Sequence, residues 1–322
     1  MKTLINTLRV LVGLLFTITG IVKLNDPLGY AFLLQDYFGH GGLYIGFIYN
    51  HALAVAGILT LIETILGVAL ILGYAIQLMK WVLLISTFSL TILILITAYS
   101  HNGENCNYLS SIVTLSPELS FWKFLGLFII ASIIFIKSYL IRPIYKLMLS
   151  KWILFITFIL CLLVTYKSLM HLPFVDTSPY QKGTTIINKI DTTDTYKTTP
   201  WDFNIFLGNK DLTPTILEHE NLILIVSYDL NNTEAEGWDN VKSLIKKVGK
   251  KDYKVLVLAS ATEEAIADFK DELNLTVDFA QIDREQAKRM IRSNPGLLLL
   301  KNGTIIKKKH WNDINHLKLR QK

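Results

Sequence analysis

The stretch that decides the fold is Trp152–Leu169, which reads WILFITFILCLLVTYKSL and lies near the middle of the chain. An α-helix rises about 1.5 Å per residue, so about 20 apolar residues cross the roughly 30 Å hydrocarbon core of a bilayer. This run and its flanks are just long enough to cross. Because the sequence before it is hydrophobic and the sequence after it is rich in charge, the run joins a membrane half to a water-soluble half.

The composition supports this division. The chain has 322 residues, room for about two domains, but a mean hydropathy of +0.39 is too apolar for two soluble ones. The net charge of +6 is unevenly distributed, because residues 1–170 hold ten Lys and Arg against five Asp and Glu, and residues 171–322 hold twenty-two against twenty-one. The soluble half is nearly neutral, which argues against a nucleic-acid partner and leaves the lipid bilayer as the expected surroundings.

Four further apolar runs precede the deciding stretch. They are Leu4–Leu24, Ala52–Ile76, Trp81–Tyr99 and Phe121–Ile136. No A-x-A-like cleavage site follows the first run, so we expect a retained transmembrane helix there and not a cleaved signal peptide. Between the first two runs we expect a short interfacial helix from about Leu28 to Phe38, because Tyr and Phe suit the headgroup boundary. Five crossings put the two ends of the chain on opposite sides of the membrane.

The loops between the runs carry a charge bias that predicts orientation. If the N-terminus is cytoplasmic, the cytoplasmic segments hold no acid and these bases: Lys2, Arg9, Lys80, Lys137, Arg142, Lys146 and Lys151. The opposite side holds only three bases, which are Lys23, Lys123 and Lys167. The positive-inside rule therefore predicts a bacterial inner-membrane protein with a cytoplasmic N-terminus and a periplasmic C-terminal domain.

Two motifs in the first half carry a family resemblance. The sequence GIVKLNDP at residues 20–27 and the sequence LIETILGVALILG at residues 61–73 resemble the DoxX and MauE-like family of small membrane proteins. The resemblance implies a four-helix membrane bundle over residues 1–140, associated with redox and thiol chemistry or with maturation of exported redox enzymes. Relatives often carry a C-x-C-F-G segment before the fourth span. The corresponding stretch here, residues 100–124, has a single cysteine, Cys106.

Cys106 is the candidate reactive thiol, which could exchange with a partner's thiol, although a thiol without a role is the alternative. The other cysteine, Cys161, falls inside the fifth span, so a disulfide between the two would need an improbable approach of their Cα atoms. Without a cysteine pair the bundle has no dithiol motif. No close set of four metal ligands is present in the sequence either, so no metal site is expected.

An ionisable residue, Glu63, lies about midway through the second apolar run. An ionised carboxylate is costly there, so it should be neutral, paired or facing a wet cavity. We expect a candidate intramembrane polar site formed by Glu63 with Lys23 and Asp26 at the outer end of the first run. The alternative is a structural hydrogen bond from Glu63 to a hydroxyl on the facing helix, such as Thr17 or Thr19.

The second half begins with a segment of low apolar content. Residues 171–214 are rich in Thr, Asp, Lys and Pro, which predicts a linker on the surface. The expected division of the chain is a bundle over 1–140, a cytoplasmic loop and fifth transmembrane helix over 141–170, an extracytoplasmic linker over 171–214 and a domain over 215–322.

From Asn221 the pattern is typical of a soluble α/β unit. Apolar runs predict strands at Leu222–Tyr228, Tyr253–Ala259 and Val277–Ile282. Helical spacing predicts helices at Trp238–Val248, Glu263–Leu273 with Thr262 as its N-cap, and Glu285–Ile291. Alternating strands and helices predict a layered core with parallel strands.

The end of this unit is its most specific feature. Asn294-Pro295 precedes an extended run that starts at Gly296, and Asn302-Gly303 then predicts a hairpin. A strand opened by proline and followed by a hairpin resembles the thioredoxin fold, which implies a cis Asn294-Pro295 bond. We interpret Asn294, Pro295 and Gly296 as a candidate peptide-binding groove. The alternative is that Pro295 only shapes the fold.

The place of the thioredoxin C-x-x-C motif holds no cysteine. It reads SYDLNNTEAEGWDNVKSL at residues 227–244. Asp229, Glu234 and Glu236 could act as an acid-base pair, but a solvated acidic loop at a helix start is the better interpretation. We therefore expect no dithiol catalysis from this domain and assign no catalytic residue.

Two function classes follow. The first is a non-catalytic assembly, scaffold or maturation factor for membrane or exported proteins, with the C-terminal domain as a binding module. The second is a quinone- or thiol-linked oxidoreductase component of the DoxX/MauE type, for which quinone would be the cofactor. The missing cysteine pairs favour the first, and a Cys106→Ser variant would discriminate the two.

Overall fold

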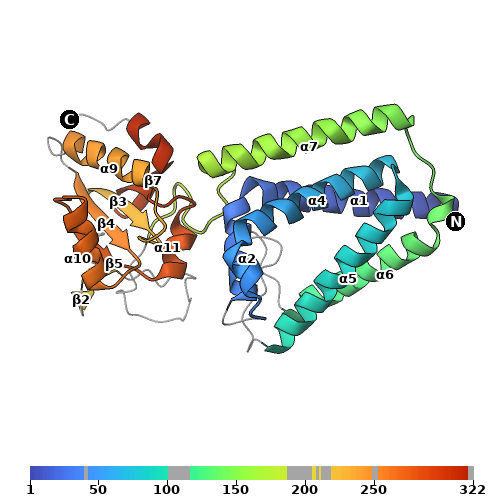
Figure 1. Cartoon of the computed structure of the whole chain (residues 1–322), viewed down its shortest axis with the longest axis horizontal. Coiled ribbons are helices and arrows are strands. Elements are labelled where there is room, and N and C mark those ends of the chain that lie inside the picture. The colour runs from blue at the N-terminus through green and yellow to red at the C-terminus, as the bar shows by residue number, and fades with distance from the viewer. Residues whose placement is uncertain are drawn as a thin grey trace. The chain divides into compact units, whose positions relative to one another are not determined.

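The computed structural model describes residues 1–39, 43–100, 117–186, 205–207, 210–211, 219–248 and 253–317. The chain divides into two compact units, Met1–Leu169 and Met170–Lys322. The first unit is built of helices and the second is built around a β-sheet (Figure 1).

Five helices of the first unit are long and apolar enough to cross a membrane. They are α1 (Lys2–Asn25), α4 (Ala52–Leu72), α5 (Ile76–Ser100), α6 (Pro117–Ile136) and α7 (Leu147–Met170). The predicted fold class, five membrane helices followed by a mixed α/β domain, is confirmed. The helices begin up to five residues before the predicted apolar runs, and α4 stops at Leu72 and not at Ile76. Gly73 has a φ of 67° and Ala75 a φ of 44°, and this left-handed backbone ends the helix before α5 begins.

Helices α1 and α4 pack closely through small residues (Figure 1). A Cβ atom added to Gly67 would lie 2.5 Å from the backbone nitrogen of Thr17, and one added to Gly20 would lie 2.3 Å from the hydroxyl of Thr64. Only glycine fits at such distances, which lets the two backbones approach as in other small-residue helix pairs. The side chains of this interface are therefore held within short reach of each other.

A shorter helix, α2 (Pro27–Phe38), follows α1 directly, and α3 (Gly46–Asn50) comes next. Asp26 caps α2 because its carboxylate accepts from the backbone N–H of Gly29 at 2.8 Å. Helix α2 buries Tyr30 and Leu34 in a cluster with Ala52 and Ala56 of α4. A helix is thus present where the sequence predicts one from about Leu28, and its place at the membrane interface stays a prediction.

The sheet of the second unit has the strand order β2-β1-β5-β4-β3-β6-β7. Its strands are β1 (Phe206–Leu207), β2 (Lys210–Asp211), β3 (Asn221–Ser227), β4 (Lys254–Ala259), β5 (Asp278–Gln281), β6 (Gly296–Lys301) and β7 (Thr304–His310). Strands β3, β4 and β5 are parallel as predicted, whereas β6 and β7 are antiparallel. The sheet is therefore mixed.

Helices cover both faces of this sheet. They are α9 (Ala235–Val248), α10 (Glu263–Glu272), α11 (Arg284–Met290) and the 3₁₀-helix η2 (Trp311–His316). Side chains of β3 alternate, so that Ile223 and Ile225 pack with α9, while Leu224 and Val226 pack with Met290 of α11. Thr262 caps α10 by accepting from the N–H of Ala265, as its sequence position predicts.

The predicted hairpin and the predicted cis bond are both present. Asn302 and Gly303 have φ values of 45° and 72°, which is the backbone that a two-residue hairpin turn between β6 and β7 requires. The peptide bond between Asn294 and Pro295 is cis.

The structure differs from the expected surface linker in the described parts of residues 171–214. Tyr180, Ile186 and Ile205 are buried in the same cluster as the strands of the sheet. Next to Ile205, β1 pairs with β5. The apolar residues of this stretch are few and irregularly spaced among Thr, Asp, Lys and Pro, so they show no period by which the sequence could reveal them.

Candidate functional site

The polar site between α1 and α4 is built around the carboxylate of Glu63. One carboxylate oxygen, Oε2, accepts from the ammonium Nζ of Lys23 at 2.8 Å. The other oxygen, Oε1, accepts from the hydroxyl of Thr19 at 2.5 Å. The Lys23 side chain is 4% exposed and the Glu63 side chain 16%, so the ion pair is shielded from solvent. The two partners that the sequence offered as alternatives occur together, one on each oxygen.

Helical spacing explains why these groups meet. Thr19 and Lys23 are four residues apart and therefore lie on one face of α1. Glu63 faces them from the middle of α4, next to the close contact at Gly20. Thr17 was the other predicted hydroxyl partner of Glu63. It donates instead to the carbonyl of Gly13 in its own helix at 2.8 Å.

An aromatic ring from α2 lies beside the ion pair. The Nζ atom of Lys23 is 5.0 Å from the centroid of the Tyr30 ring, a distance at which a cation is attracted to the ring face. Asp26 contributes by capping α2, the helix that carries Tyr30. Sequence reasoning missed Tyr30, although the Asp-Pro helix start four residues earlier was a signal that a helix follows there.

The site can hold a proton and can present a charge to a polar ligand. A buried pair is strongly coupled, so removing one partner leaves an uncompensated charge and costs about 3–5 kcal/mol.

Among the described residues there is neither a reactive-thiol site nor a metal site. Cys106 lies outside them, so the candidate reactive thiol is not placed. Cys161 is a free cysteine buried in α7. In the part of the chain that the structure describes, no three His, Cys, Asp or Glu side chains gather to hold a metal ion.

The second candidate site surrounds Asn294, and its three predicted residues, Asn294, Pro295 and Gly296, are buried. The Asn294 side chain accepts from the hydroxyl of Ser227 at 2.7 Å and donates to the carbonyl of Asp229 at 2.6 Å. Its backbone carbonyl accepts from the N–H of Glu234 at 3.0 Å. The chain's own loop after β3 therefore occupies the partners that a bound peptide would use.

The acids of this loop have structural partners. Asp229 receives a hydrogen bond from Arg284 at 2.7 Å and others from the backbone N–H groups of Asn231 and Asn232. Glu236 lies in the first turn of α9, where a negative charge suits the helix dipole. These contacts support the interpretation of an ordered acidic loop over that of an acid-base pair.

Two titratable groups lie near the Asn294 site, of which Tyr228 is half-buried and His310 is buried. Burial raises the pKa of Tyr228 to about 12, although the charge of Arg292 opposes the rise, so its phenol stays protonated. Burial lowers the pKa of His310 to about 4. Its ring nitrogen Nδ1 accepts from the N–H of Asn312 at 3.3 Å, which a neutral ring does and a protonated ring does not.

Five long apolar helices, followed by a sheet domain, define a multi-pass membrane protein with a C-terminal mixed α/β domain. Residues 1–140 match the model of the family described as methylamine utilisation protein MauE. A search of the curated proteins and a search of the solved structures found no match to this chain. The resemblance of residues 1–140 to the MauE family is thus confirmed, and the C-terminal domain is described by its topology alone.

Proposed function

We propose that this protein is a membrane-anchored assembly or maturation factor for membrane or exported proteins, whose C-terminal domain binds a partner without thiol chemistry. One observation carries the proposal: residues 171–322 contain no cysteine. Reduction of a disulfide needs a nucleophilic thiolate and normally a second, resolving thiol. The loop Asp229–Glu234, where the thioredoxin resemblance would put that thiolate, is instead hydrogen-bonded to Asn294.

The charge bias of the loops supports a periplasmic position for the binding domain. Seven bases and no acid fall on the side that holds the N-terminus, and the five spans put the domain on the opposite side. The bacterial inner membrane is the compartment that this arrangement fits. A partner would then be another membrane protein or an exported one.

The groove beside Pro295 is the proposed binding surface of this domain. An incoming extended peptide would replace the N–H of Glu234 on the Asn294 carbonyl with an N–H of its own. One hydrogen bond to the Asn294 carbonyl is lost and one is formed, so main-chain bonding contributes little net free energy. The specificity for a partner would therefore come from side-chain contacts. The alternative that Pro295 only shapes the fold remains open to the test below.

The test uses the full-length protein in mild detergent. We expect no reduction of insulin, and we expect co-purification of a membrane or exported partner that Pro295→Ala weakens and Lys247→Ala leaves unchanged. Lys247 is exposed on the last turn of α9 and serves as the control. Reduction of insulin by the protein would refute the proposal. If Pro295→Ala binds the partner as well as the parent does, the groove beside Pro295 is not the binding surface. The maturation role would then depend on another surface of the protein.

A second candidate, a quinone- or thiol-linked oxidoreductase component, is favoured by the polar site in the bundle. The pair of Lys23 and Glu63 lies beside the Tyr30 ring, an arrangement suited to a quinone head group. This candidate predicts that purified protein carries quinone and that Glu63→Gln loses it. It also predicts that Cys106→Ser abolishes whatever activity the intact protein supports.

A further inference from the structure

Arg9 of α1 is a buried cation in the first unit. It is only 2% exposed, and its Nε atom is enclosed without a hydrogen-bond partner. Its Nη1 atom donates to the backbone carbonyl of Arg142 at 3.4 Å. Among the residues that the structure describes, Arg9 forms no ion pair. Because a guanidinium in a protein always carries its charge, this charge has no counter-ion within the described chain.

The guanidinium lies at the turn between α4 and α5. A side chain at Gly73, the residue that follows α4, would overlap Nη1 of Arg9. The last carbonyls of α4 carry a partial charge of about −0.5, which compensates the guanidinium only in part. Glu63 cannot supply the rest, because its partner Lys23 lies roughly 21 Å further along α1 than Arg9 does.

A second cation, from α5, reaches the segment that Arg9 contacts. Lys80 lies one turn into α5, and its Nζ atom donates to the hydroxyl of Ser138 at 3.4 Å. This Nζ atom also lies 5.0 Å from the centroid of the Phe135 ring. Ser138 begins the 3₁₀-helix η1 (Ser138–Leu140), and the carbonyl that accepts from Arg9 follows shortly after it. In the described part of the chain Lys80, too, forms no ion pair.

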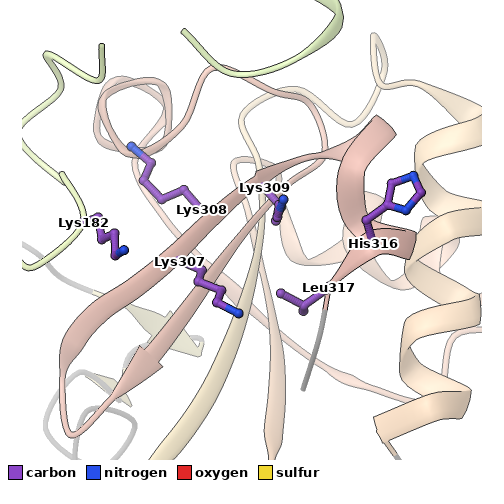
Figure 2. Close-up of a pocket in the computed structure, with 6 residues that line it drawn as sticks. All are labelled: Lys182, Lys307, Lys308, Lys309, His316 and Leu317. Atoms are coloured by element: carbon purple, nitrogen blue, oxygen red, sulfur yellow. The ribbon is translucent and has the colours of Figure 1, made fainter. Parts of the chain in front are cut away.

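The basic residues of the second unit have a different environment. A hollow of about 320 Å³ beside β7 is lined by Lys182, Lys307, Lys308, Lys309, His316 and Leu317 (Figure 2). Lys308 donates there to the carboxylate of Asp176 at 2.7 Å, and Lys307 also has an interaction partner. By contrast, the described partners of Arg9 and Lys80 are a carbonyl, a hydroxyl and an aromatic ring, none of which carries a net charge.

We propose that Arg9 and Lys80 together bind the phosphate group of an anionic phospholipid. A turn between two membrane spans lies at the edge of the hydrocarbon core, because its open backbone groups need polar surroundings, and lipid phosphates lie at that level. A guanidinium can donate two parallel hydrogen bonds to a phosphate, and a lysine adds a point charge. The phosphate would replace the Arg142 carbonyl, whose bond to Arg9 is long and therefore weak.

The two cations also favour one kind of headgroup. A zwitterionic headgroup brings a cation of its own next to its phosphate, and that cation would be repelled by Arg9 and Lys80. An anionic headgroup brings none. This inference uses contacts within the first unit alone and does not depend on the proposed function.

Native mass spectrometry of the full-length protein in detergent can measure the dissociation constant of the first bound lipid. We expect phosphatidylglycerol to bind more tightly than phosphatidylcholine. Lys80→Gln should weaken the binding of phosphatidylglycerol about fivefold, the contribution of one lysine near anionic lipid. Arg9→Gln should weaken it about tenfold or more, because paired bonds from a guanidinium to a phosphate are stronger. If Arg9→Gln does not fold, Lys80→Gln decides the test.

The matched control is Lys151→Gln, which removes the same charge from an exposed lysine of α7 and should leave the binding unchanged. Equal affinity of the parent for both lipids would overturn the inference, and so would equal weakening by Lys151→Gln and Lys80→Gln. Inorganic phosphate without lipid is the third arm. If it binds as tightly as phosphatidylglycerol and Lys80→Gln weakens it equally, the ligand is a soluble phosphate and the lipid assignment is wrong.

Discussion

At the scale of single residues, the pair of Lys23 and Glu63 has an energetic consequence in the bilayer. Both oxygens of Glu63 accept hydrogen bonds, so the carboxylate is satisfied where an isolated one would be costly. Sequence reasoning found this pair because a charged residue inside an apolar run stands out. It missed the Tyr30 ring and the bonds of Asn294, because contacts between segments far apart in sequence leave no local pattern.

Substitutions of Glu63 test the pairing. Glu63→Gln keeps an acceptor for Thr19 but removes the counter-charge of Lys23, so it should still insert and fold, with a stability lowered by as much as about 3–5 kcal/mol. Glu63→Lys faces the ammonium of Lys23 and adds about 2.5–3.5 kcal/mol on insertion scales, so its yield of monodisperse protein should fall sharply. The exchange variant Lys23→Glu/Glu63→Lys should recover part of that loss. A Lys variant as stable as the parent would mean that residue 63 faces water.

His310 makes the stability of the second unit depend on pH. Its pKa falls from 6.5 to about 4 on folding, so the unfolded chain binds a proton that the folded chain rejects between these values. Stability is therefore complete above about pH 6.5 and decreases as the pH falls toward 4, by about 3 kcal/mol in all. Nearby Asp313 opposes this pKa shift and His171 adds to it.

The measurement is urea denaturation of residues 170–322 at about pH 7.5 and about pH 5. His310→Gln should flatten the difference in unfolding free energy between the two pH values. His316→Gln, which changes an exposed imidazole nearby, should leave the difference as it is. An unchanged difference in His310→Gln would show that another group is responsible.

At the scale of elements, the close contact of α1 with α4 fixes how the membrane unit packs. Gly67→Leu puts a Cβ atom 2.5 Å from the Thr17 backbone, so the helices must separate, at a cost of about 1–3 kcal/mol or more. Gly57→Leu is the control on the same helix, because a Cβ atom there meets nothing within 4 Å. Thermal unfolding in detergent should show a lower midpoint for Gly67→Leu only. Equal midpoints would contradict the packing.

Long elements with a clear apolar run or period could be predicted from the sequence, and short elements could not. The apolar runs gave all five long helices, and the Asn-Gly pair gave the β6–β7 hairpin. The end of α4 was misplaced because the left-handed backbone at Gly73 and Ala75 interrupts a run that stays apolar in sequence. Strands β1 and β2 have only two residues each and η2 has six, too short for any periodic signal.

At the scale of the whole molecule, the second unit needs the segment that the sequence suggested was only a linker. Tyr180, Ile186 and Ile205 are buried in its core, and each buried side chain of this size stabilises by about 1.5–3 kcal/mol. Their sum is comparable with the entire stability of a typical domain, about 5–15 kcal/mol. A fragment of residues 170–322 should therefore fold alone, whereas one of residues 215–322 should not.

Amide exchange or proton NMR dispersion distinguishes the two fragments. The triple variant Tyr180→Ser/Ile186→Ser/Ile205→Ser in the longer fragment should behave like the shorter one. A well-folded fragment of residues 215–322 would show that the buried side chains before it are dispensable.

The order in which the chain is synthesised gives the ion pair of the membrane unit a further consequence. Lys23 leaves the ribosome 40 residues ahead of Glu63, which is roughly 2–8 s at about 5–20 residues per second. During that interval the flexible stem of Lys23, in the last turn of α1, lets its ammonium reach the aqueous boundary. When Glu63 later enters the membrane, the ammonium of Lys23 is therefore already present in α1 to pair with its carboxylate. If Glu63 preceded Lys23 in the chain, its carboxylate would lie unpaired in the middle of the bilayer until the lysine was synthesised.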